Sequence, residues 1–88
     1  MKILIYDDDL EELTQLSDLL EPLLSKRHIQ ADVQGVSTQQ DFHNYLAQEE
    51  PDVVFLDIYL DDETMGTELA KELRETKKNF SLIFVSTS

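Results

Sequence analysis

Apolar residues along this chain form short continuous runs, separated by longer stretches in which they recur at helical spacing. Residues 3–6 and 53–56 are continuously apolar, which is typical of strands buried on both faces of a parallel sheet. Residues 80–85 predict a third buried strand. Between residues 29 and 36, apolar and polar side chains alternate, which predicts an edge strand with one solvated face.

Helical patterns fill the stretches between these strands. In the first, leucines recur at helical spacing over residues 10–24, and Asp9 is placed to cap the helix. Pro22 lies inside this pattern and cannot donate a backbone hydrogen bond, so we expect it to kink or split the helix. The second helix is predicted to begin after a cap at Ser37 or Thr38.

A third helical pattern covers residues 65–74, after a polar loop that follows the central strand. The predicted order of elements is therefore βαβαβαβ, with one helix between successive strands. That order predicts an α/β fold with an open parallel sheet, right-handed crossovers and helices on both faces. Within this class, a flavodoxin-like strand order would make 80–85 an interior strand flanked by a fifth.

The carboxyl ends of the predicted strands carry acidic residues. Parallel strands end at the same edge of a sheet, so this edge should gather Asp7, Asp8, Asp9 and Asp57 beside the hydroxyls that follow residue 85. Two unit charges about 4 Å apart repel by about 4 kcal/mol at an effective dielectric constant of 20. A small domain has only about 5–15 kcal/mol of stability in total. Either these acids extend into water as a solvated rim, or a cation lies among them.

A cation at such a cluster would be Mg²⁺, because hard oxygen ligands with room for water suit it. A carboxylate cluster loaded with Mg²⁺ beside a hydroxyl suits phosphoryl transfer, in which the metal neutralises charge on the transferring group. His28 and His43 each lack a partner at ligand spacing, so neither predicts a metal site.

The composition narrows the function classes. The chain has 88 residues, enough for one small domain, and its 19 acidic and 7 basic residues give a net charge of −12. That charge argues against direct contact with nucleic acid or with an anionic membrane surface. There are no cysteines, no signal-peptide pattern and no apolar run long enough to span a membrane, so we expect a cytoplasmic domain.

Four segments together resemble the receiver domain of two-component response regulators, over essentially the whole chain. They are ILIYDDD at 3–9, PDVVFLDI at 51–58, GTELAKELR at 66–74 and IFVS at 83–86. The resemblance implies that Asp57 is the phosphoacceptor, which attacks the phosphorus of a phosphohistidine on a sensor histidine kinase. It also implies a Mg²⁺ site in which Asp8 is a direct ligand, Asp7 acts largely through water and the Tyr59 backbone carbonyl completes the set with Asp57.

The resemblance further implies a switch hydroxyl at Ser86, with Thr87 as the fallback if the strand register differs by one. The expected output is a phosphorylation-dependent change in an effector domain, most simply a DNA-binding domain that regulates transcription. A protein of this kind is a signalling phosphoacceptor rather than an enzyme. Its only chemistry is its own phosphotransfer and autodephosphorylation.

The chain departs from the family pattern at its end. Residues 1–88 match the N-terminal part of a receiver domain, whose C-terminal helix, strand and helix are missing, and with them the lysine that contacts the phosphoryl group. We therefore expect a truncated or proteolysed chain that self-associates through the bare edge of the strand at 80–85. The segment around 84–86 is similar to regulators with a LytTR-type DNA-binding domain. In the loop after residue 57, Asp61 or Asp62 replaces the usual proline.

Two other hypotheses stay open at this stage. The pattern Asp7-x-Asp9 is similar to that of haloacid-dehalogenase-like phosphatases, in which Asp7 would be the nucleophile and Asp9 the acid. However, Glu11 stands where that family has Thr or Val, and Asp57 would have no role. The other hypothesis is a receiver-like interaction module that is not phosphorylated.

Overall fold

In the computed structural model, residues 1–57, 71, 74–75 and 80–85 are described. Its strands are β1 (Lys2–Tyr6), β2 (Asp32–Val36), β3 (Val53–Asp57) and β4 (Ser81–Val85). All pair in parallel, in the order β2-β1-β3-β4. This order agrees with the first four strands of the flavodoxin-like arrangement, so the predicted fold class is confirmed. β2 lies at one edge of the sheet, as its alternating pattern indicated.

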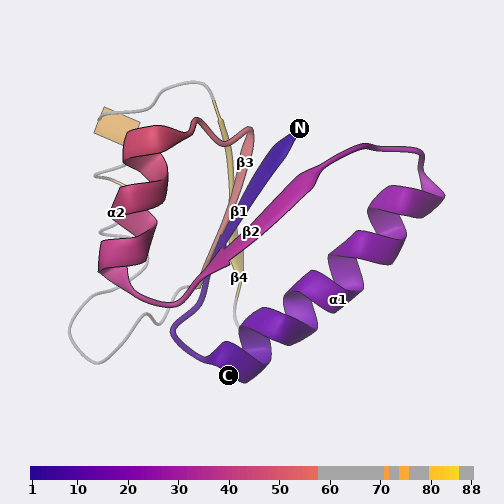
Figure 1. The fold of residues 1–88 in the computed structure, drawn as a ribbon, viewed down its shortest axis with the longest axis horizontal. Helices are drawn as coiled ribbons and strands as arrows, with labels where there is room; N and C mark the ends of the chain where they lie inside the picture. Colours follow the sequence, from indigo (N-terminus) through magenta and orange to yellow (C-terminus); the bar gives the residue numbers. More distant parts are fainter. Residues whose placement is uncertain (58–70, 72–73, 76–79, 86–88) are drawn as a thin grey trace.

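Among the described residues, two helices cover the sheet from opposite sides: α1 (Leu10–Lys26) and α2 (Gln39–Gln48) (Figure 1). Successive residues of a strand face opposite sides, so each central strand contributes to two cores. Ile3 and Ile5 pack with Leu13 of α1, whereas Leu4 and Tyr6 pack with Phe42 of α2. Leu4, Ile5, Val54 and Leu56 are fully buried, which explains why their segments are continuously apolar.

Both helices begin at predicted caps. The Asp9 side chain accepts hydrogen bonds from the backbone N–H groups of Glu11 (2.9 Å) and Glu12 (3.4 Å). The Thr38 hydroxyl accepts one from the Asp41 N–H at 3.1 Å, which decides between the two candidates for the second cap. These caps satisfy N–H groups that have no partner within the helix and fix where each helix starts.

Pro22 does not split α1, which continues through it to Lys26. Pro22 and Asp18, four residues earlier, are both exposed. The Asp18 carbonyl that loses its intrahelical donor can therefore be hydrated, which lowers the cost of proline at this position.

β2 begins at Asp32, three residues later than the sequence pattern predicted. The preceding residues belong to the C-terminal cap of α1. His28 has a left-handed backbone (φ 58°), its N–H donates to the Ser25 carbonyl at 3.0 Å, and the Ile29 N–H donates to the Leu24 carbonyl at 2.8 Å. This pair of bonds is a Schellman motif, and it keeps these residues out of the sheet.

β4 is the outer strand at the other edge of the described sheet, as expected for residues 1–88, and the side chains described at its start are partly exposed. β4 begins at Ser81, which is exposed, and Ile83 is 43% exposed, while Phe80 just before the strand is buried. Arg74 lies over the Phe80 ring and donates to its carbonyl at 3.2 Å, which ties the helical residues 74–75 to the start of β4. Most of the predicted helix at 65–74 lies outside the described residues. In the described part of the chain, no helix is long and apolar enough to cross a membrane.

Candidate functional site

The two central strands both deliver an aspartate to the carboxyl edge of the sheet. β1 and β3 pair in register up to Tyr6 and Leu56. The residue that follows Tyr6 is Asp7, and the residue that follows Leu56 is Asp57. The Asp7 N–H donates to the Val36 carbonyl at 3.1 Å, which extends the pairing of β1 with β2 by one residue. Both aspartates are buried, with exposed fractions of 0% for Asp7 and 5% for Asp57.

The Asp7 carboxylate is only partly satisfied. Its Oδ1 atom accepts a hydrogen bond from the Asp9 N–H at 3.0 Å, but Oδ2 is buried without a hydrogen-bond partner. Burial raises the pKa of Asp7 to about 6, the Asp9 N–H opposes this shift, and the negative charges of Asp57, Glu12 and Asp8 add to it. A buried acceptor without a partner is costly, so this atom is one place where a ligand would stabilise the fold.

A third acid, Glu12, completes the cluster. One carboxylate oxygen from each of Asp7, Glu12 and Asp57 lies within 4.8 Å of the others. Glu12 is half-buried in the first turn of α1. Glu12 was given no role in this site from the sequence. The missed signal is its spacing from the cap, because an acid three residues after an N-cap reaches back toward the start of the helix.

Mg²⁺ fits this donor set. The three groups supply hard carboxylate oxygens close enough to share an ion, and a cation beside Asp7 would give Oδ2 the partner that it lacks. A divalent charge would also offset the repulsion among the three acids. The predicted cation at this edge is therefore compatible with the residues that the structure brings together.

The predicted site residues have different outcomes. Asp7 and Asp57 come together as expected, whereas Asp8 is exposed and lies outside the cluster of three, so its role as a direct ligand stays a prediction. Asp9 serves as the cap of α1, which gives no support to a role as a catalytic acid beside Asp7. Three further predicted site residues lie outside the described residues: Tyr59, Ser86 and Thr87.

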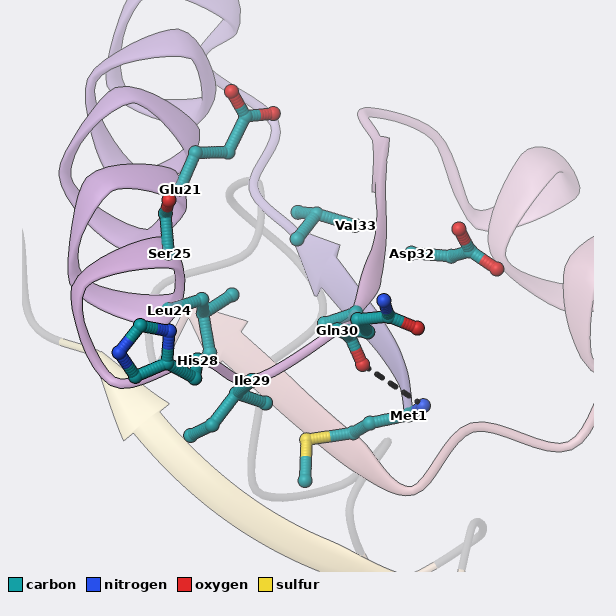
Figure 2. Close-up of a pocket in the computed structure, with 10 residues that line it drawn as sticks. Met1, Glu21, Leu24, Ser25, His28, Ile29, Gln30, Asp32 and Val33 are labelled. Carbon is teal, nitrogen blue, oxygen red and sulfur yellow. Dashed lines mark hydrogen bonds between the residues drawn. The ribbon is translucent and has the colours of Figure 1, made fainter.

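A separate groove lies at the amino ends of the strands, between the end of α1 and the start of β2 (Figure 2). Leu24, Ser25 and His28 line one side, and Asp32 and Val33 line the other. Met1 and Gln30 also line the groove, and the N-terminal amine of Met1 donates a hydrogen bond to the Gln30 carbonyl at 3.3 Å. The groove is thus a product of the cap of α1 and is distant from the acid cluster.

Comparison with solved structures places this arrangement among response regulators. The receiver domain of a DNA-binding response regulator from Colwellia psychrerythraea 34H superposes with a TM-score of 0.84 at 26% identity, covering 100% of this chain and 69% of that one. The MaeR response regulator bound to beryllium trifluoride gives 0.81 at 25% identity, covering 100% of this chain and 68% of that one.

DrrB from Thermotoga maritima, an OmpR/PhoB homologue, gives a TM-score of 0.76 at 29% identity, covering 97% of this chain but 35% of that one. The chain thus spans about a third of this relative and about two thirds of the receiver structures. Comparison with curated proteins gave no match. The family model for the response regulator receiver domain matches residues 3–88. The chain therefore belongs to the response regulator receiver domain family.

Proposed function

We propose that this chain is a phosphoacceptor, which takes a phosphoryl group from a sensor histidine kinase onto Asp57 with Mg²⁺. The observation that carries the proposal is the convergence of the Asp7, Glu12 and Asp57 carboxylates, with one Asp7 oxygen buried and unpartnered. Such a site repels a phosphoryl donor until a cation offsets its charge. The ion would be held by Asp7, Asp8, Asp57 and the Tyr59 carbonyl.

The proposed reaction is a single phosphoryl transfer to the side chain of Asp57. A carboxylate oxygen of Asp57 bonds to phosphorus as the phosphorus–nitrogen bond of the donor phosphohistidine breaks, which leaves an acyl phosphate on Asp57 and a histidine on the kinase. When bound, Mg²⁺ would neutralise charge on the phosphoryl oxygens. Asp57 is held at the end of β3, in register with β1, so the nucleophile is positioned by the two central strands rather than by a loop.

The proposed output is a change of state that an effector domain reads in the cytoplasm, most simply to regulate transcription. After transfer, the hydroxyl of Ser86, or of Thr87, would contact the phosphoryl group. The protein would carry out only its own phosphotransfer and autodephosphorylation. β4 is the outer strand of the described sheet. Self-association through it stays a prediction, which sedimentation over a concentration series tests.

Labelling with a small phosphodonor tests the proposed nucleophile. With Mg²⁺ present, the wild-type chain should gain a label that hydroxylamine removes, as expected for an acyl phosphate. Asp57→Asn keeps the shape of the side chain but removes the nucleophile, so it should abolish labelling. The matched control is Asp52→Asn, which changes an exposed aspartate at the other end of the same segment and should label normally.

Other results would select the alternatives. A label that survives in Asp57→Asn and disappears in Asp7→Asn would identify Asp7 as the nucleophile, as the phosphatase hypothesis requires. A chain that binds Mg²⁺ but gains no label from any donor would be an interaction module. The MaeR and DrrB receivers are described with beryllium trifluoride. Adding it to this chain should shift backbone amide signals near Asp57, and Asp57→Asn should prevent the shift.

A further inference from the structure

Glu12 is the member of the acid cluster that the proposed function leaves without a role. It comes from a helix, whereas Asp7 and Asp57 come from the ends of strands, so it approaches the site from a different side. It is half-buried, and one of its carboxylate oxygens lies within 4.8 Å of oxygens from both aspartates. Like charges this close in a half-buried setting lower stability, and a cation among them would offset that cost.

The start of α1 explains why Glu12 points to the site. Asp9 is the N-cap, so Glu12 is the third helical residue, whose side chain can reach back past the cap. The donor that such a glutamate meets in a capping box is the N–H of the N-cap residue. In this chain the Asp9 N–H donates to Asp7 Oδ1 at 3.0 Å, and the Glu12 N–H donates to Asp9 Oδ1 at 3.4 Å, so hydrogen bonds link Asp7, the cap and the backbone of Glu12.

A second observation points to a ligand between these groups. Asp7 Oδ2 belongs to a side chain that is 0% exposed, and no hydrogen bond reaches this atom. A cation among the carboxylates would contact this oxygen and would reduce the repulsion that Glu12 adds.

We infer that Glu12 is a further carboxylate of the cation site, which contacts the bound divalent ion, or one of its waters, from the first turn of α1. The inference rests on the cation site of the proposed function, and it assigns to that site a residue from α1. The charge of Glu12 would be offset only when the ion is present. Removing this charge should therefore have opposite effects on the ion-bound and the ion-free chain. It should weaken ion binding and stabilise the ion-free fold.

Glu11 provides a matched control. It lies in the same first turn of α1, carries the same charge and interacts with the same helix dipole, but it is exposed and outside the cluster. Glu11→Gln and Glu12→Gln therefore change net charge and dipole interactions equally. Any difference between the two variants reports on the contact with the ion.

The test is a Mg²⁺ titration of the 88-residue chain, followed by backbone amide shifts at residues 7–12 and 57. Glu12→Gln should weaken the affinity roughly tenfold, in the range found for residues that support metal ligands, and Glu11→Gln should stay within about twofold of wild type. Thermal unfolding with a chelator supplies the second readout. There Glu12→Gln should unfold at a higher temperature than Glu11→Gln, which excludes damage to the fold as the cause of weaker binding.

Equal affinities for the two variants would overturn the role of Glu12 while leaving the cation site intact. A wild-type chain without Mg²⁺-dependent shifts at residues 7–12 and 57 would overturn the cation site itself, and the inference with it. The two failures are therefore distinguishable in one titration.

Discussion

Acidic residues lie at both ends of the parallel strands, which we call the amino edge and the carboxyl edge of the sheet. They are exposed at the amino edge and buried at the carboxyl edge. At the amino edge, the Lys2 N–H donates to Asp52 Oδ2 at 2.8 Å, and the Lys2 ammonium pairs with Glu49. The side chains of that ion pair are 44% and 45% exposed. At the carboxyl edge, Asp7 and Asp57 are buried, and within the described part of the chain Asp7 has no cationic partner.

The difference shows how position turns one residue type into two kinds of site. At the amino edge, the exposed acids Asp52 and Glu49 are paired with Lys2 and accessible to water, so they do not require a further ligand. Exposed ion pairs of this kind contribute little to stability. At the carboxyl edge, burial removes the water while the topology brings like charges together. An electrostatic cost remains there, and the proposed divalent cation would offset it.

The largest expected effect comes from removing the buried charge at Asp7. The pKa of Asp7 is about 6 in the folded chain, against an ordinary value of 3.8. The folded state therefore holds a proton that the unfolded state has lost, and the free energy of unfolding falls as pH rises from about 4 to 6. The difference between the two pKa values corresponds to at most about 3 kcal/mol. Asp7→Asn should stabilise the ion-free chain by up to that amount above pH 6 and by little below pH 4.

Chemical denaturation with a chelator present, at pH 4 and at pH 7, measures this effect. Asp52→Asn at the amino edge serves as the control for the change in net charge, and it should show no comparable gain. Saturating Mg²⁺ should reduce the advantage of Asp7→Asn, because the ion stabilises the wild-type chain more. An Asp7→Asn variant that is less stable than wild type at pH 7 without the ion would contradict this account of the carboxyl edge.

Local patterns explain how much of this fold was predictable. The strand at 3–6 is buried on both faces, and the strand at 53–56 is buried on one face and partly buried on the other. Asp9 and a hydroxyl residue cap the helices. These features were predictable because they depend on adjacent residues. The convergence of Asp7 and Asp57 followed from the parallel topology alone. These parts of the fold and site need no knowledge of detailed side-chain contacts.

The features that sequence reasoning missed depend on contacts between elements or on unusual backbone geometry. The start of β2 was misplaced because His28, rather than glycine, takes the left-handed position after α1. Pro22 was expected to kink or split the helix, and it does not split α1, because it lies on an exposed face that tolerates it. Glu12 joins the acids only because α1 is seated against β1 and β2, and that seating depends on the contact between Leu13 and Gly35.

Gly35→Ala should have the second-largest effect, by disturbing that seating. A Cβ atom at Gly35 would lie 2.9 Å from Leu13 Cδ1 and 3.0 Å from Cγ, and Leu13 is buried against Ile3 and Ile5. Overpacking of this kind costs about 1–3 kcal/mol, and the reduced flexibility of the unfolded chain offsets about 0.4–1 kcal/mol. We expect a net loss of about 1–2 kcal/mol in the free energy of unfolding.

A double-mutant cycle with Leu13→Ala tests the cause. If the contact with Leu13 is responsible, Gly35→Ala should cost less when Leu13 is already shortened. The same cost in both backgrounds would place the strain elsewhere. Because Glu12 precedes Leu13, the Gly35→Ala chain should also bind Mg²⁺ more weakly than wild type, which links the packing of α1 to the carboxyl edge.

The smallest effect should come from the amino edge. Glu49 raises the pKa of Lys2, mainly through their hydrogen bond, so the pair stabilises the folded state as long as Lys2 is protonated. Both side chains are well exposed, and salt and water screen the attraction. Glu49→Gln should therefore leave the denaturation midpoint at neutral pH nearly unchanged at physiological ionic strength, with a small loss visible only at low salt. If Glu49→Gln lowered the free energy of unfolding by as much as Asp7→Asn raises it, solvent exposure would not explain the difference between the two edges. That result would contradict the comparison.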